Sequence, residues 1–236
     1  MKQRIARLAL GTLIGLVFLA LVALGIWQVE RRSWKLALIA QVEQRLQAPP
    51  VAAPGPRAWP GIDADDVYTR VVAQGRYRPA SDTFVQASTA MGAGYWVLTP
   101  LDTGTFTLLV NRGFVPPALR GKVSPPQGEV TVTGLLRLSE PNGGFLRSND
   151  ARADRWYSRD VAAIAAKRGL TNVAPYLIDA SEPRSGWPRG GLTVVTFRNN
   201  HLSYAFTWFG LAAGLLVMVA VARRWGKEPR QGPDDA

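Results

Sequence analysis

The sequence predicts a membrane protein in which two transmembrane helices flank a mainly antiparallel β outer domain with one or two helices of its own (α+β). Three observations predict this fold class. Residues 8–27 and 202–222 are long runs without a charge, the residues from 67 onward alternate between apolar and polar, and Gly, Pro and Asp separate the alternating segments. A helix needs about 20 apolar residues to cross a bilayer, so both runs are long enough to span one.

The first uncharged run, residues 8–27, follows a basic start at residues 1–7. Basic residues before a span favour a cytoplasmic N-terminus, but Arg31, Arg32 and Lys35 follow this span, so the first helix alone decides little about orientation. A cleaved signal peptide is the alternative, because Ala23 and Gly25 form a small-x-small site. We expect a retained span instead, because the run exceeds the usual signal core of about 7–15 residues.

The second run, residues 202–222, has stronger flanking charges. Arg198 stands alone before it, whereas Arg223, Arg224, Lys227 and Arg230 follow it. This asymmetry places the end of the chain in the cytoplasm. The expected partition is a cytoplasmic N-terminus at 1–7, a first span at 8–27, a periplasmic domain at 28–201, a second span at 202–222 and a cytoplasmic tail at 223–236.

The outer domain begins with a helical pattern at residues 28–47, so the first helix is expected to project from the bilayer. Period-two alternation then predicts strands at residues 67–78, 83–88, 95–101, 106–114, 128–138, 174–179 and 193–197. Residues 159–168 have the one helical pattern within this β region. We expect an antiparallel meander that forms a small barrel or a strongly curved sheet.

Small-x-x-x-small patterns occur in both spans, at Gly11 and Gly15 and at Gly210 and Gly214. Such patterns let two membrane helices approach closely. Glycine is also common in membrane helices without any such contact, so both interpretations remain open.

The composition excludes several classes of function. The chain has 236 residues, no cysteine and one histidine, which excludes disulfides, iron–sulfur clusters and a Ser-His-Asp triad in the outer domain. The formal net charge is +11, but the basic residues are scattered and form no stripe, so we expect no nucleic-acid partner. No nucleophile lies at a spacing that pairs it with a base, and we expect no enzymatic activity.

The only histidine, His201, lies where the second span begins. At about 100° per residue, one helix face carries His201, Tyr204, Ala205, Trp208, Ala212 and Leu215. A flat apolar ligand such as a porphyrin fits beside two aromatic planes and two small alanines, with neutral imidazole as axial ligand. The alternative is that the aromatic residues are interfacial anchors and the histidine is solvated.

Several segments together resemble the surfeit locus protein 1 family of cytochrome oxidase assembly proteins. They are residues 24–28 (Leu-Gly-Ile-Trp-Gln), 30–35 (Glu-Arg-Arg-Ser-Trp-Lys), 75–77 (Gly-Arg-Tyr), 97–100 (Val-Leu-Thr-Pro), 109–116 (Leu-Val-Asn-Arg-Gly-Phe-Val-Pro), 134–137 (Gly-Leu-Leu-Arg), Asn149 with Trp156 and Asp160, and 198–209 (Arg-Asn-Asn-His-Leu-Ser-Tyr-Ala-Phe-Thr-Trp-Phe). One departure is Phe114, where tryptophan is common in the family.

The resemblance implies a two-span protein of the bacterial inner membrane that helps to assemble the large subunit of a haem-copper terminal oxidase. It also implies contact with haem a on its way from haem a synthase, with His201 as the expected axial ligand of the iron. Tyr204 and Trp208 come from the helix face, and Arg198 is expected near the haem propionates. The alternatives are a membrane scaffold that never binds haem and, less favoured, a membrane-anchored hydrolase.

Overall fold

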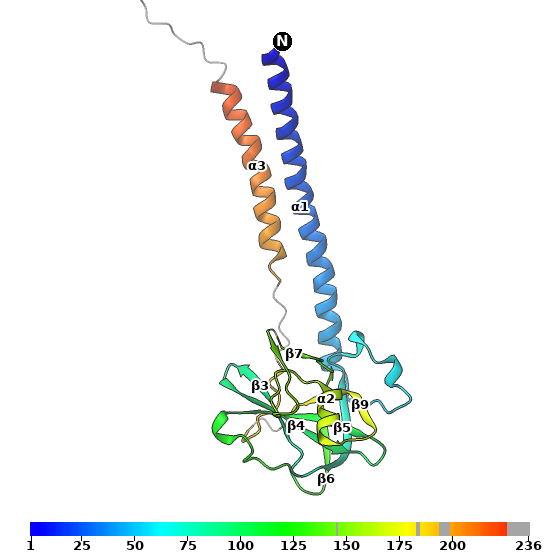
Figure 1. Ribbon diagram of the computed structural model, residues 1–236. Coiled ribbons are helices and arrows are strands. Elements are labelled where there is room, and N and C mark those ends of the chain that lie inside the picture. The colour runs from blue at the N-terminus through cyan, green and yellow to red at the C-terminus, as the bar shows by residue number, and fades with distance from the viewer. Residues whose placement is uncertain (145, 183–184, 194–198, 226–236) are drawn as a thin grey trace, which may run out of the picture. The chain divides into compact units, whose positions relative to one another are not determined.

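The structure, a computed structural model, describes residues 1–144, 146–182, 185–193 and 199–225. The chain forms two compact units. One unit contains helix α1 (Lys2–Gln47) as far as Gln41 together with helix α3 (His201–Trp225). The other unit begins at Val42 and contains all the strands (Figure 1).

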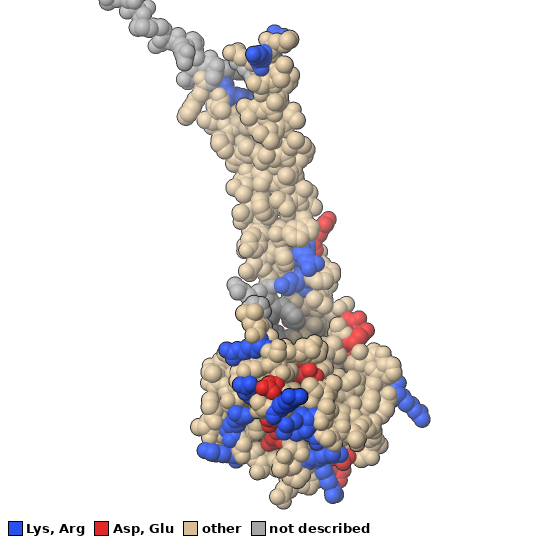
Figure 2. Space-filling view, in the orientation of Figure 1, with Lys and Arg blue, Asp and Glu red and all other residues tan. Residues whose placement is uncertain are grey.

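Helices α1 and α3 are both long and apolar enough to cross a membrane, judged by length and composition. Residues 8–29 and 202–222 contain no charged residue, and the face of the helices visible in Figure 2 is uncharged over most of its length. Helix α1 continues without a break to Gln47, so the helical extension predicted at residues 28–47 is confirmed. Pro49 and Pro50 follow its end, where proline cannot continue the helical hydrogen bonds.

The β unit contains nine strands and one α-helix within its described residues. They are β1 (Val51–Ala52), β2 (Arg70–Tyr77), β3 (Thr83–Thr89), β4 (Gly92–Asp102), β5 (Thr107–Val115), β6 (Glu129–Leu138), β7 (Gly143–Gly144), β8 (Arg147–Ser148), α2 (Val161–Arg168) and β9 (Val173–Ala180). Short 3₁₀ helices cover Trp59–Gly61, Ala64–Asp66 and Pro117–Leu119.

Strands β2, β6, β9, β5 and β4 close into a barrel, because the end of β2 also pairs with β4. Strands β1 and β3 extend the sheet beyond this ring. Most pairs are antiparallel, as predicted, but β9 lies between β6 and β5 and runs parallel to β5. The expected simple meander is therefore wrong. A hairpin meander uses only consecutive strands, whereas here the segment containing α2 returns β9 to the middle of the sheet.

Gly75 makes the closure of the barrel possible. It lies in β2 one residue before Arg76, the first β2 residue that pairs with β4. A Cβ atom at this position would overlap the backbone carbonyl of Asp102 in β4. Only glycine lets the two backbones approach this closely.

Two apolar clusters lie on opposite sides of the barrel wall. The inner cluster takes alternate residues of the five strands, with Tyr176, Ile178 and Val110 among them. The outer cluster packs Leu109 and Leu177 under α2. Asp160 caps the N-terminus of α2 through a hydrogen bond from the Ala163 amide, and Gly169 ends the helix in the left-handed conformation.

The sequence predicted most of these elements. The strands expected at residues 67–78, 83–88, 95–101, 106–114, 128–138 and 174–179 correspond to β2, β3, β4, β5, β6 and β9, and the helix expected at 159–168 corresponds to α2. The strand expected at residues 193–197 is different. Thr193 is not in a strand, and residues 194–197 lie outside the described part of the chain.

Candidate functional site

His201 is the first residue of α3 and is half-buried. Its Nδ1 atom lies 2.7 Å from Oε1 of Gln28 in α1. Among the described residues, no hydrogen bond to Nε2 is found. One imidazole nitrogen is therefore engaged by the neighbouring helix, and the other is available to a ligand.

The helix face that carries His201 is also the face that packs against α1. The least exposed residues of α3 are His201, Ala205, Trp208, Ala212, Leu215 and Val219. Ala205 and Ala212 are each only 3% exposed. On α1, a Cβ atom added to Gly25 would lie 2.5 Å from the ring of Phe209.

This packing corrects the expectation of open room beside the two alanines. Small side chains leave space, but α1 fills it, because close packing of the two helices buries more apolar surface than an empty groove does. The face predicted as a platform for a flat ligand is therefore largely a helix–helix contact. His201 differs from the alanines because it lies at the end of this contact and is only half-buried.

The glycine pairs do not make a close helix contact, which was one of the two interpretations left open by the sequence. Cβ atoms added at Gly11, Gly15, Gly210 and Gly214 would meet no atom within 4 Å, and all four residues are exposed. The close approach of the helices uses Gly25 instead. The predicted pairs lie on the outward sides of their helices.

The other predicted site residues are distributed differently. Trp208 is half-buried on the same face as His201, whereas Tyr204 is 55% exposed and lies off that face. Arg198 lies outside the described residues. Next to it, the Oδ1 atom of Asn199 is buried and has no hydrogen-bond partner among the described residues.

These residues fit one-sided ligation of a haem. A haem iron needs a single neutral imidazole on one side, and His201 has one nitrogen without a hydrogen-bond partner in the described part of the chain. Leu202, Tyr204 and Phe206 expose apolar surface within two turns of that histidine. Within the described residues there is no group of three or more His, Asp or Glu side chains arranged for a bare metal ion.

A second polar centre lies in the wall of the barrel, and its partners were not predicted from the sequence. Asp179 of β9 is 6% exposed and accepts hydrogen bonds from Asn111 Nδ2 at 2.8 Å, Arg159 Nη1 at 2.9 Å and Thr193 Oγ1 at 3.0 Å. Arg159 also pairs with Glu140. A cavity of about 330 Å³ opens beside this group.

Electrostatic effects favour the charged forms of Arg159 and Glu140. Burial disfavours the charge of Arg159, but hydrogen bonds and attraction from Glu140 and Asp179 outweigh burial and raise the pKa of Arg159. Burial also opposes ionisation of Glu140, but the hydrogen bond and charge of Arg159 lower the pKa of Glu140. Each charge in this group is compensated by a neighbour, which indicates a structural role rather than a reactive one.

In the glycine-rich segment from Asn142 to Asp150, polar groups are likewise hydrogen-bonded to neighbouring residues. Asn149 Oδ1 accepts hydrogen bonds from the Tyr157 and Ser158 amides, and the Ser158 hydroxyl accepts one from the Gly143 amide. The Asn142 amide donates a hydrogen bond to Asp160, which ties the segment to the N-terminus of α2. Trp156 is buried in the outer cluster rather than exposed to a ligand.

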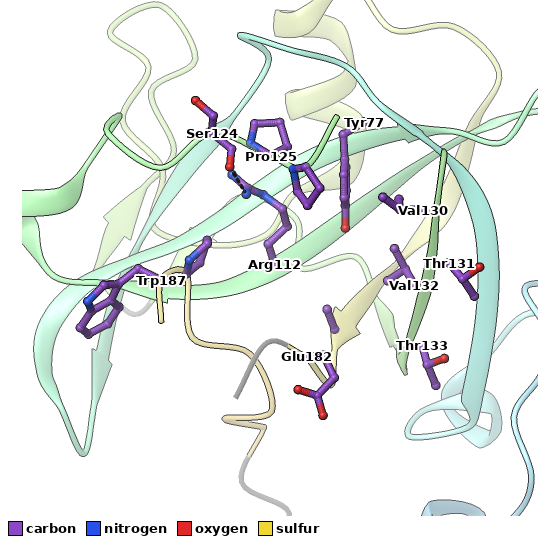
Figure 3. A pocket seen from close by; sticks show the side chains of 13 residues that line it. Tyr77, Arg112, Ser124, Pro125, Val130, Thr131, Val132, Thr133, Glu182 and Trp187 are labelled. Carbon is purple, nitrogen blue, oxygen red and sulfur yellow. Dashed lines mark hydrogen bonds between the residues drawn. The ribbon is translucent and has the colours of Figure 1, made fainter. Parts of the chain in front are cut away.

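A larger cavity of about 540 Å³ lies at one end of the barrel (Figure 3). Val130, Val132, Pro125 and Trp187 give it a mainly apolar lining. Figure 3 shows the Arg112 guanidinium directed at the Ser124 carbonyl on its wall. Burial raises the pKa of Tyr77, which also lines the cavity, to about 12, although Arg112 opposes the shift.

Comparison with known proteins agrees with this architecture. The profile of the SURF1 family matches residues 15–213. Surfeit locus protein 1 of Rattus norvegicus is 36% identical over 218 residues, which cover 80% of this chain and 68% of the relative. The Homo sapiens protein of the same name is 36% identical over 219 residues, which cover 80% of this chain and 69% of the relative.

A bacterial relative matches over nearly the whole length of both chains. The SURF1-like protein of Rickettsia bellii is 28% identical over 219 residues, which cover 89% of this chain and 88% of the relative. The matched region includes α1 from residue 15 onward, the entire barrel and the first part of α3, with His201 as its first residue. The chain therefore belongs to the SURF1 family.

Proposed function

We propose that this protein is an assembly factor for a haem-copper terminal (cytochrome c) oxidase, and that it binds haem a through His201 and helps its insertion into the large oxidase subunit. Membership of the SURF1 family, whose members are generally cytochrome oxidase assembly factors and not catalysts, supports the first part. The observation that carries the second part is the single histidine, with one ring nitrogen engaged by Gln28 and the other without a partner among the residues that the structure describes.

In this proposal each named residue has a distinct role. Haem a, when bound, supplies an iron that accepts the free imidazole nitrogen of His201. Tyr204 and Trp208 contribute apolar surface beside the histidine, and Arg198 pairs with a propionate. The protein releases haem unchanged, so it acts as a chaperone between haem a synthase and the large oxidase subunit.

We further propose that α1 and α3 cross the bacterial inner membrane, with both termini in the cytoplasm and residues 28–201 on the periplasmic side. The contacts of Gly25 with Phe209 and of Gln28 with His201 make the two helices antiparallel. Lys2 and Arg4 therefore lie toward the same end of the helix pair as Arg223 and Arg224. A basic end on both helices favours the cytoplasmic side.

A scaffold that stabilises an oxidase assembly intermediate without binding haem is the second candidate. The mainly apolar cavity of the barrel, with Trp187 38% exposed at its edge, favours a role in holding a partner. In that case His201 would serve only to join the two helices, and its removal would leave oxidase assembly intact.

Haem content distinguishes the two candidates. The full-length protein is co-expressed with the enzymes that make haem a, purified in mild detergent, and assayed by its reduced pyridine haemochrome spectrum. We expect haem a with the wild type and with Asn200→Ala, an exposed neighbour that serves as control, and its loss in His201→Ala. Absence of haem from all three proteins, in cells that contain haem a, would support the scaffold.

A further inference from the structure

We infer that Gln28 is a positioning residue for His201: its amide oxygen accepts a hydrogen bond from Nδ1–H and so leaves Nε2 unprotonated as the nitrogen that binds the iron. The inference rests on the proposed function, which it deepens. It assigns a role to the last residue of the Leu-Gly-Ile-Trp-Gln segment, to which the sequence alone gave none.

Burial makes the Gln28 contact necessary. Gln28 is only 9% exposed, although it directly follows the uncharged run of α1. A buried amide is costly unless its polar atoms are hydrogen-bonded, particularly between apolar helices. In the described residues, His201 Nδ1 at 2.7 Å is the partner of its oxygen.

The chemistry of the two groups determines the tautomer. An amide oxygen has lone pairs and no proton, so the contact requires a proton on Nδ1. In a neutral imidazole the other nitrogen then carries the lone pair, which is the form that binds a metal. Histidines that ligate metals commonly donate their second ring N–H to an oxygen acceptor, which also orients the ring.

The helix packing keeps Gln28 in place. Gly25, one helical turn earlier on α1, lies against the ring of Phe209. Ala205 of α3, one turn after His201, is buried in the same contact. Gln28 and His201 are 173 residues apart in sequence, so this contact depends on the pairing of α1 with α3.

The tautomer can be measured in the haem-free protein. The chain contains a single histidine, so the signal comes from His201 alone. Selective labelling with ¹⁵N-histidine, in full-length protein purified without a histidine tag, gives one imidazole. Its two nitrogen shifts report which atom carries the proton. We expect a protonated Nδ1 and an unprotonated Nε2 in the wild type and in Gln41→Met, an exposed glutamine of the same helix that serves as control.

Gln28→Met removes the acceptor while keeping the length of the side chain. We expect a shift of the proton toward Nε2 and, in a haem titration, about 10- to 100-fold weaker affinity. Gln28→Glu restores an acceptor, so it should restore the Nδ1–H tautomer and haem binding. Because carboxylate is the stronger acceptor, it should also lower the midpoint potential of the bound haem.

The outcomes separate the two proposals. An unchanged tautomer and unchanged haem affinity in Gln28→Met, with haem bound by the wild type, would overturn the role of Gln28 and leave the haem function standing. A wild type that binds no haem but shows the Gln28-dependent tautomer would overturn the haem function alone. Recovery by Gln28→Glu excludes the possibility that Gln28→Met acts through misfolding.

Discussion

The barrel and the helix pair differ in how completely their buried polar groups are hydrogen-bonded. In the barrel wall, Asp179 accepts hydrogen bonds from three side chains and also faces the guanidinium of Arg137 at 3.9 Å. In the helix pair, His201 has one hydrogen-bonded nitrogen, and its other nitrogen has no hydrogen-bond partner among the described residues. In the barrel wall, the polar groups are already hydrogen-bonded to one another. In the helix pair, the second ring nitrogen of His201 can still form a bond.

This difference shows why perturbed charges alone do not mark the site. The pKa values that shift most clearly belong to groups of the barrel, such as Arg159 and Tyr77, whose surroundings are already satisfied or apolar. The candidate haem ligand, His201, is instead recognised by a ring nitrogen that has no hydrogen-bond partner in the part of the chain that the structure describes. Substitutions in the barrel should therefore change stability, and those at the helix pair should change binding.

The largest effect is expected from Asp179→Ala. It leaves the buried Arg159 and Asn111 without their shared carboxylate, and removal of one partner from a buried ion pair costs about 3–5 kcal/mol. Urea unfolding of the full chain in mild detergent, followed by tryptophan fluorescence, measures the loss. Asp65→Ala, which removes a carboxylate that is 93% exposed, is the control and should change little. A loss as small as that of the control would mean that the centre is not structural.

A smaller effect is expected from Gly25→Val in the helix pair. The added methyl groups collide with Phe209, and overpacking costs about 1–3 kcal/mol. The chain has no cysteine. Cysteines introduced at the exposed positions Leu13 and Val221 can therefore be spin-labelled specifically.

The measurement for Gly25→Val is the distance distribution between these labels by pulsed electron paramagnetic resonance. We expect a broader or longer distribution with Gly25→Val and no change with Gly210→Val, whose added atoms meet nothing. Equal behaviour of the two variants would contradict the packing of α1 on α3.

The smallest effect is expected from Glu140→Gln. The pKa of Glu140 is lower in the folded protein than in the unfolded chain, so its ion pair with Arg159 stabilises the fold above the ordinary pKa of about 4.3. That contribution is lost as the pH falls through the lowered value. Glu140 is 42% exposed, so solvent limits the contribution to about 1 kcal/mol or less.

Urea unfolding of the wild type and Glu140→Gln between pH 7 and pH 3 tests this sign. The stability difference should be largest at neutral pH and should disappear in acid. Glu129→Gln, at an exposed position, is the reference. A difference that stays constant over the whole range would show that the effect of the substitution is not electrostatic.

Local patterns predicted the strands because each strand has one face in the core, which produces alternation of period two. The order of the strands was not predictable in this way. The position of β9 between β6 and β5 depends on pairings such as Asn111 with Asp179, which are distant in sequence. The same distance concealed the Asp179 centre, because its partners come from β5, β6, the segment before α2 and the segment after β9.

The candidate ligand was predictable because His201 is the only histidine and lies at the start of an apolar run. The residues that surround His201 were not predictable from the sequence. A helical projection shows which residues share a face, but it does not show what covers that face, and α1 covers it here. The buried Gln28 could have been suspected, because a lone amide at the end of an apolar run is a candidate for a contact between helices.

Closure of the barrel has a consequence for how partners can be recognised. Among the described strands of the large sheet, the two that are left at its edges are β1, which has two residues, and β3. The outer edge of β3 is partly occupied, because the Gln86 amide donates to the Trp156 carbonyl. A sheet with so little open edge resists unwanted strand pairing and offers a poor template for adding a partner's strand. The surface that this sheet presents to a binding molecule consists mainly of side chains rather than of unpaired backbone groups.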